Sequence, residues 1–98
     1  MTVYVDDSRI EATVGRYRSR WSHLFSDSAT YDELHAFAAR LGLRRSWFQH
    51  KPPRGPRSFD YSHYDLTEGK RERAIQLGAT PVSWWDTPGI LRSAQVGR

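Results

Sequence analysis

Two stretches of this chain repeat one pattern, in which a helical segment ends at a glycine and leads into a short aromatic strand. Residues 39–43 lead to residues 46–48, and residues 75–79 lead to residues 83–85. Together with a first strand near the start of the chain, the pattern indicates β-α-β-α-β order. It therefore predicts an α/β fold with a small three-stranded, mostly parallel sheet, right-handed crossovers and two to three helices. A mixed sheet is the alternative.

Local signals place the main elements. The β-branched and aromatic residues 2–5 are typical of a buried strand. Thr30 and Glu33 form a capping-box pattern, which predicts a helix that ends at Gly42. Thr67 can cap a second helix through about residue 77.

The remaining stretches carry weaker signals. Residues 46–49 and 81–84 resemble strands, and a last short helix is expected to start near Pro88. Residues 8–29 lack clean periodicity, which predicts a loop with a short helical turn. The Pro- and Arg-rich stretch at about residues 50–60 is expected to be an exposed loop.

Composition limits the classes of protein that are compatible with this chain. With 98 residues, it is expected to form a single α/β domain over residues 1–98. The absence of cysteine excludes disulfide scaffolds, thiolate metal sites and cysteine nucleophiles. No leader-like or membrane-spanning stretch is visible, so we expect a cytoplasmic protein that does not contact membranes. A net charge of +4 favours anionic partners.

Polar and aromatic side chains gather at a few points where ligands could bind. In an open parallel sheet, ligands bind beyond the carboxyl ends of the strands and near the amino ends of helices. This rule selects residues that follow the first two predicted strands and residues in the loop before the second helix. His35 and the stretch 21–23 are added because their side chains offer hydrogen-bond donors and an aromatic ring for stacking. The candidate ligand-binding residues are Asp6, Asp7, Trp21, His23, His35, Gln49, His63, Tyr64 and Asp65.

Histidine and carboxylate are the metal ligands that remain in a chain without cysteine. Candidates of this kind are His23, His63, Asp65 and Asp6, a set that suits zinc, manganese or iron. No H-E-x-x-H, H-x-H or EF-hand run is present, so the spacing does not assign a metal. A divalent metal is an open alternative, and each histidine could instead be a structural residue.

Three functions are compatible with these residues. The first hypothesis is a small binding protein for a phosphate-containing ligand, a nucleotide or a nucleic-acid segment, in a pocket of His, Arg and aromatic side chains. The alternative is a metal-dependent phosphoesterase or nuclease that uses a His/Asp cluster. The third is a protein-interaction module in which exposed Trp and Arg side chains contact a bacterial protein partner. A homo-oligomer is a separate alternative.

Several short motifs, taken in order, resemble one known family. They are Val-Tyr-Val-Asp-Asp at residues 3–7, Trp-Ser-His-Leu at 21–24, residues 32–38, Trp-Phe-Gln at 47–49 and His-Tyr-Asp-Leu at 63–66. Over roughly residues 2–83 the chain is similar to a small bacterial and phage family of domains of unknown function, the one numbered 4031. The resemblance implies a bacterial or phage setting but no activity, cofactor or catalytic residue. Residues 51–61 are the least family-like part.

Overall fold

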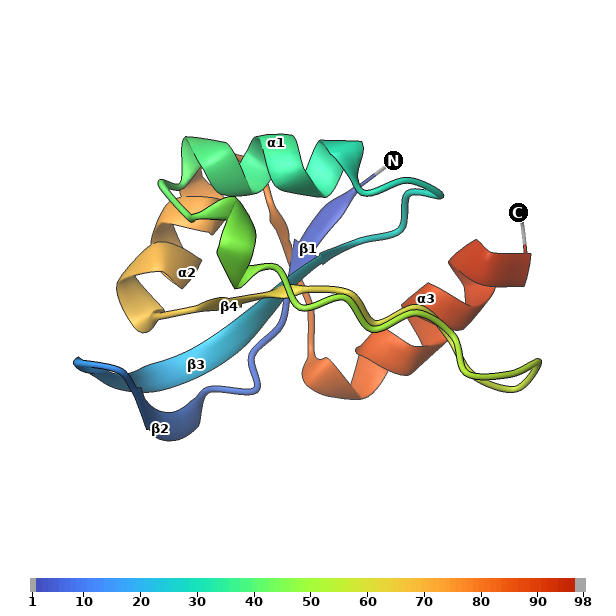
Figure 1. Ribbon diagram of the computed structural model, residues 1–98, viewed down its shortest axis with the longest axis horizontal. Coiled ribbons are helices and arrows are strands. Elements are labelled where there is room, and N and C mark those ends of the chain that lie inside the picture. Colours follow the sequence, from blue (N-terminus) through green and yellow to red (C-terminus); the bar gives the residue numbers. More distant parts are fainter. Residues whose placement is uncertain (1, 97–98) are drawn as a thin grey trace.

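The computed structural model describes residues 2–96, which form a five-stranded sheet and three α-helices (Figure 1). The strands are β1 (Val3–Val5), β2 (Ile10–Val14), β3 (Tyr17–Ser26), β4 (Tyr64–Leu66) and β5 (Thr80–Pro81). The helices are α1 (Asp32–Arg40), α2 (Glu68–Gln76) and α3 (Thr87–Val96), with 3-10 turns η1 (Arg45–Trp47) and η2 (Trp84–Asp86).

The sheet has five strands and is mostly antiparallel, so the predicted three-stranded, mostly parallel sheet is wrong, while the α/β class is confirmed. The strand order is β2-β3-β1-β5, and β4 also pairs with β3. Only β1 and β5 run parallel among these pairs. The mixed sheet that was the alternative describes the topology better.

The difference arises mainly in residues 8–29, which were predicted to be a loop but form β2 and the ten-residue strand β3. All five residues of β2 are exposed, so this strand has no buried face and no apolar alternation. Gly15, with φ of +60°, makes the turn between the two strands. The sequence signal of this hairpin is therefore weak.

The middle of β3 is paired on both edges. Leu24 lies opposite Val5 of β1 on one edge and opposite Tyr64 of β4 on the other. The side chains of these three residues lie in one core cluster with residues of α1 and α2. It is the main apolar core, formed by Val3, Val5, Leu24, Leu34, Phe37, Ala38, Leu41, Tyr64, Leu66, Ala74 and Ala79.

Both main helices are confirmed, with one correction at an end. The Thr67 hydroxyl accepts a hydrogen bond from the Lys70 amide at 3.3 Å, as a cap of α2. Helix α1 begins at Asp32 without a side-chain cap, so Thr30 does not have its predicted role. Gly42 and Gly78 follow the two helices with φ of +78° and +108°.

Other local predictions need correction. Residues 46–49 do not form a strand, because η1 occupies Arg45–Trp47 and Gln49 makes only an isolated bridge with His63. The strand predicted at residues 81–84 is limited to Thr80–Pro81. Residues 63–65, expected in a loop, lead into and form β4. The stretch 51–57 is exposed and irregular, as predicted.

None of the helices described in the structure has the length and apolar character that crossing a membrane requires.

Candidate metal centre

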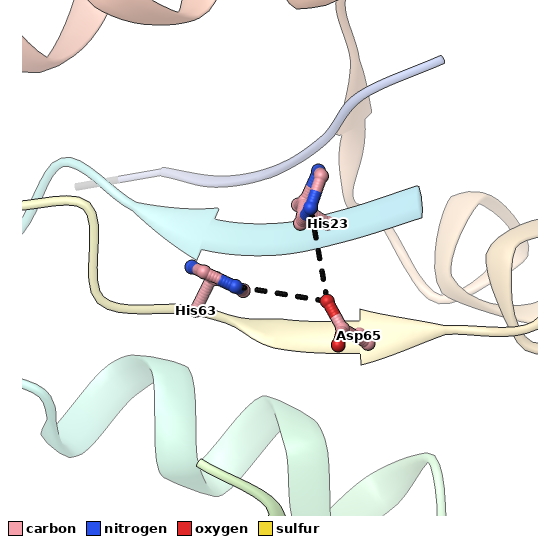
Figure 2. A group of neighbouring side chains, drawn as sticks. All are labelled: His23, His63 and Asp65. Carbon is pink, nitrogen blue, oxygen red and sulfur yellow. Dashed lines mark ion pairs between the residues drawn. The ribbon is translucent and has the colours of Figure 1, made fainter. Parts of the chain in front are cut away.

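The face of the sheet opposite α1 and α2 carries a cluster of imidazoles and carboxylates. His23 of β3 and Asp65 of β4 are direct partners across the two strands, so their side chains leave the sheet on the same side. His63 precedes Asp65 by two residues, and its backbone exchanges hydrogen bonds with Gln49 at 2.9 and 3.1 Å. This pairing keeps the segment extended, and His63 therefore points to the side of Asp65 (Figure 2).

Three donor atoms converge in this cluster. The Nε2 atom of His23 lies 3.7 Å from Oδ1 of Asp65, and the Nε2 atom of His63 lies 3.6 Å from the same oxygen (Figure 2). One ligand atom from each residue lies within 4.8 Å of the others. These distances are too long for direct hydrogen bonds. Donors about 2.1 Å from a tetrahedral cation stand roughly 3.4 Å apart. The two distances to Asp65 are close to that spacing, whereas the set as a whole extends to 4.8 Å, so the two imidazoles would have to move closer together to enclose an ion.

Each imidazole is held at its other nitrogen by an acceptor. His23 Nδ1 lies 2.7 Å from Oδ2 of Asp6, and His63 Nδ1 lies 2.6 Å from the carbonyl oxygen of Tyr61. Because a carbonyl or a carboxylate can only accept, each Nδ1 carries the proton. In the neutral tautomer that results, both Nε2 lone pairs are directed toward Asp65. Metal-binding histidines are oriented by outer acceptors in this way.

Asp6 is the buried anchor of the cluster, with a side chain only 1% exposed. Its Oδ1 accepts hydrogen bonds from the backbone amides of His23 at 3.0 Å and Ser8 at 3.2 Å, and from the Ser8 hydroxyl at 2.9 Å. Burial alone would raise the pKa of the Asp6 carboxyl, but hydrogen bonds and charge from His23 outweigh it and hold the pKa below the usual value. Asp6 is therefore ionised at neutral pH.

The two histidines differ in their affinity for protons. Burial lowers the pKa of His23, but the hydrogen bond and charge of Asp6, with the charge of Asp65, outweigh it and raise the pKa overall. Burial also lowers the pKa of His63; the Tyr61 carbonyl opposes this effect, the neighbouring His23 charge adds to it, and the pKa stays below the usual value. At neutral pH His63 is therefore the more available metal ligand, because its Nε2 atom is more readily unprotonated. His23 has the higher affinity for a second proton and must lose that proton before its Nε2 atom can bind a cation.

Two more side chains complete the surroundings of Asp65. The amide nitrogen of Gln49 donates to Oδ2 of Asp65 at 2.5 Å, which leaves Oδ1 toward the histidines. The Tyr61 ring packs 4.8 Å from the His63 ring and 5.6 Å from the His23 ring, measured between centroids. Burial, together with the charges of Asp6 and Asp65, raises the pKa of Tyr61, so its hydroxyl stays protonated.

Solvent reaches the cluster from the side of Asp65. The side chain of Asp65 is 35% exposed, compared with 18% for His23 and 7% for His63. A groove of about 710 Å³ adjoins Asp65 and Gln49 and runs toward the β2–β3 turn. Two imidazoles and one carboxylate would leave coordination positions open, as catalytic metal sites do. A substrate in the groove could occupy them.

Comparison with known proteins places the chain in a family. Residues 3–94 match the family described as protein of unknown function (DUF4031). The chain belongs to that family. The resemblance inferred from short motifs is confirmed, and the matched range contains every member of the cluster. No curated protein and no solved structure matches the chain.

Within this DUF4031 chain, the four metal-ligand candidates His23, His63, Asp65 and Asp6 lie together, with Asp6 behind His23 instead of among the converging atoms. Gln49 joins them through its bond to Asp65. Trp21 lines the adjoining groove, and its indole N–H donates to the Ala12 carbonyl at 2.9 Å.

Three predicted binding residues lie elsewhere in the structure. His35 and Tyr64 belong to the helix-covered face, where His35 Nδ1 lies 2.8 Å from the Tyr64 hydroxyl. Tyr64 neighbours His63 and Asp65 in sequence but points to the opposite side of the strand. Asp7 accepts a hydrogen bond from the Trp84 amide at 2.9 Å at the start of η2. None of the three contributes to the cluster.

Sequence reasoning missed Tyr61 and Ser8. The spacing Tyr61-x-His63-x-Asp65 was a usable signal, because alternate residues of an extended segment project to one side. Ser8 follows Asp6 by two residues, the spacing at which a carboxylate commonly accepts from the backbone in a turn. Both signals become informative only when the segments are known to be extended or turned.

Proposed function

We propose that this protein is a metal-dependent phosphoesterase whose divalent cation is bound by the Nε2 atoms of His23 and His63 and by the carboxylate of Asp65. One observation carries the proposal: both Nδ1 atoms are engaged by fixed acceptors, so both Nε2 atoms face one carboxylate oxygen. Two imidazoles and a carboxylate form a donor set that zinc, manganese and iron accept.

The residues around the set have distinct tasks in this chemistry. A cation bound there supplies a Lewis acid that favours ionisation of water and offsets the charge of a phosphate oxygen. Asp6 keeps the His23 ring oriented, and Gln49 keeps the Asp65 carboxylate oriented. In the reaction, the water oxygen bonds to phosphorus, the ester P–O bond breaks and the leaving oxygen takes up a proton. No oxidant or reductant is required.

Charge favours this function over the binding of a phosphate without metal, which was the first hypothesis from sequence. Asp6 and Asp65 place two carboxylates within the cluster, and these repel an anion unless a cation lies between them. The chain as a whole has a net charge of +4, which attracts anionic substrates to its surface. A cation at the cluster reconciles the local acidic groups with an anionic substrate.

The test is calorimetry on protein stripped with a chelator, titrated separately with zinc and manganese, followed by assays with bis(p-nitrophenyl) phosphate and p-nitrophenyl phosphate. We expect one cation per chain and hydrolysis only with cation present. His63→Ala and Asp65→Asn should each weaken cation binding at least about tenfold and abolish hydrolysis, because one of three donors is lost.

His50→Ala is the matched control, because His50 is exposed and contacts the Tyr31 hydroxyl at 3.1 Å instead of the cluster. Its cation affinity and turnover should equal those of the wild-type protein. Cation binding that is unaffected by His63→Ala would contradict the proposed ligand set. Tight binding without hydrolysis of either ester would contradict the proposed reaction and leave the metal site standing.

A further inference from the structure

The groove that begins at Asp65 is lined by aromatic and positively charged side chains. Its volume of about 710 Å³ is within the range of ligand sites, roughly 300–1,000 Å³. It extends from the cluster between the β2–β3 turn, the α1–η1 connection and the start of α2. The lining residues include three aromatic rings and two cations, Tyr17, Trp21, Trp47, Arg16 and Lys70.

Two of these rings are available for contact with a ligand. Tyr17 is 58% exposed and Trp47 is 47% exposed, which is a large apolar surface to leave in water. Trp21 is more covered and fixed by its bond to the Ala12 carbonyl. Tyr17 and Trp47 come from the hairpin and from η1, so the groove offers aromatic rings on different elements. Such rings are the common platforms for unpaired nucleic-acid bases.

Positive charge accompanies the rings. Arg16 and Lys70 line the groove, and the Arg44 guanidinium lies 5.6 Å from the centre of the Trp47 ring. The Lys70 ammonium donates to the Leu41 carbonyl, which leaves two of its three N–H groups for a ligand. Asp65 is the one acidic side chain among the lining residues of the described chain, and it lies at the end next to the cluster. The charge of the groove therefore complements a phosphate backbone.

We infer that the groove binds single-stranded nucleic acid, with bases stacked on Trp47 and Tyr17, phosphates beside Arg16 and Lys70, and one phosphodiester next to Asp65. This inference rests on the proposed phosphoesterase and names its substrate class. The bases of a duplex cannot stack on these rings, because they are already stacked on one another and paired. A nucleic acid is favoured over a peptide because it presents both flat bases for the rings and phosphates for the cations that line this groove.

The experiment measures binding separately from hydrolysis. Fluorescein-labelled octamers of thymidylate and of uridylate are titrated with the whole chain in EDTA, and anisotropy is recorded. We expect saturable binding of one or both octamers that weakens as salt rises. A labelled duplex of the same length should bind at least about tenfold more weakly. Because EDTA removes any cation, this result does not depend on whether the cluster binds metal.

Matched variants locate the binding. Trp47→Ala should weaken octamer binding by about five- to a hundredfold, the range for loss of one stacking partner. Trp85→Ala is the control, since Trp85 is 75% exposed and lies outside the groove lining. Arg16→Glu should weaken binding more than Arg54→Glu, which makes the same charge change in the exposed Pro-rich loop.

Absence of saturable octamer binding at low salt would overturn the inference, as would equal losses in Trp47→Ala and Trp85→Ala. Equal affinity for the duplex would also overturn it. Octamer binding in EDTA without later cleavage in manganese would contradict the phosphoesterase and support the groove. Hydrolysis of small esters without octamer binding would support the phosphoesterase and contradict the binding of nucleic acid in the groove.

Discussion

At the scale of single residues, Asp6 is the side chain on which the orientation of the cluster depends. It is buried, it fixes the His23 ring and it accepts three further hydrogen bonds from His23 and Ser8. The pKa of Asp6 is lowered in the folded chain, so its contribution to stability is full above its usual pKa of 3.8 and is lost as pH falls through the folded pKa. The pKa of His23 is raised, so its contribution is full below 6.5 and is lost as pH rises through the folded pKa.

We predict that Asp6→Asn lowers the free energy of unfolding of the metal-free protein by about 2 kcal/mol, the size of lost hydrogen bonds to a charged group. The loss should be largest between pH 3.8 and 6.5, where both ionised forms contribute. Above that window it should shrink as His23 becomes neutral. Urea unfolding at several pH values in EDTA measures this profile. Asp7→Asn is the control, and a profile for Asp6→Asn that does not change with pH would contradict the assigned ion pair.

The sequence predicts which residues form the cluster but not how they are arranged. His23, His63, Asp65 and Asp6 were selected because a chain without cysteine has few other metal ligands. Their mutual geometry could not be predicted, because it depends on the pairing of β3 with β4. His35 was selected by residue type alone, and its position on α1 directs it to the helix-covered face.

At the scale of elements, β3 explains both what was predicted correctly and what was not. Its inner half, Trp21 to Ser26, alternates between a core face and the site face, but each face includes polar residues. Binary patterning therefore failed there, whereas α1 and α2 carried glycine stops and were recognised. The helix–glycine pattern correctly located helix ends. It predicted strands after both helices, yet residues 46–49 form η1 and an isolated bridge.

The glycine at the end of α2 gives a test at this scale. Gly78 has φ of +108°, a conformation that side chains with a Cβ atom rarely adopt, although nothing lies within 4 Å of an added Cβ. We predict that Gly78→Ala lowers the free energy of unfolding by about 1–2 kcal/mol through backbone strain alone. Gly69→Ala, within α2 and equally open, should raise it by about 0.5 kcal/mol. Chemical denaturation measures both, and equal effects of the two changes would contradict the assigned backbone conformations.

At the scale of the whole molecule, the core and the candidate site occupy opposite faces of the same strands. Leu24 and Tyr64 point into the helix-covered core, while their neighbours His23 and Asp65 point to the cluster. Packing of α1 and α2 therefore fixes the register that aligns the ligands. The donors are separated by some forty residues of chain, so an unfolded chain does not present them together.

We predict from this arrangement that a bound cation stabilises the folded chain. A ligand that binds only the folded state adds about 2.7 kcal/mol when its free concentration is a hundredfold above the dissociation constant. For a chain of this size, such a gain corresponds to a rise in Tm of roughly 10–20 °C. Differential scanning calorimetry with EDTA, and then with saturating manganese or zinc, measures the shift.

Two variants serve as controls. Asp65→Asn should unfold at nearly the same temperature in both conditions, because its ligand set is incomplete. The Tm of His50→Ala should rise as that of the wild-type protein does. An equal shift in Asp65→Asn and the wild-type protein would contradict a stabilising cation bound by Asp65.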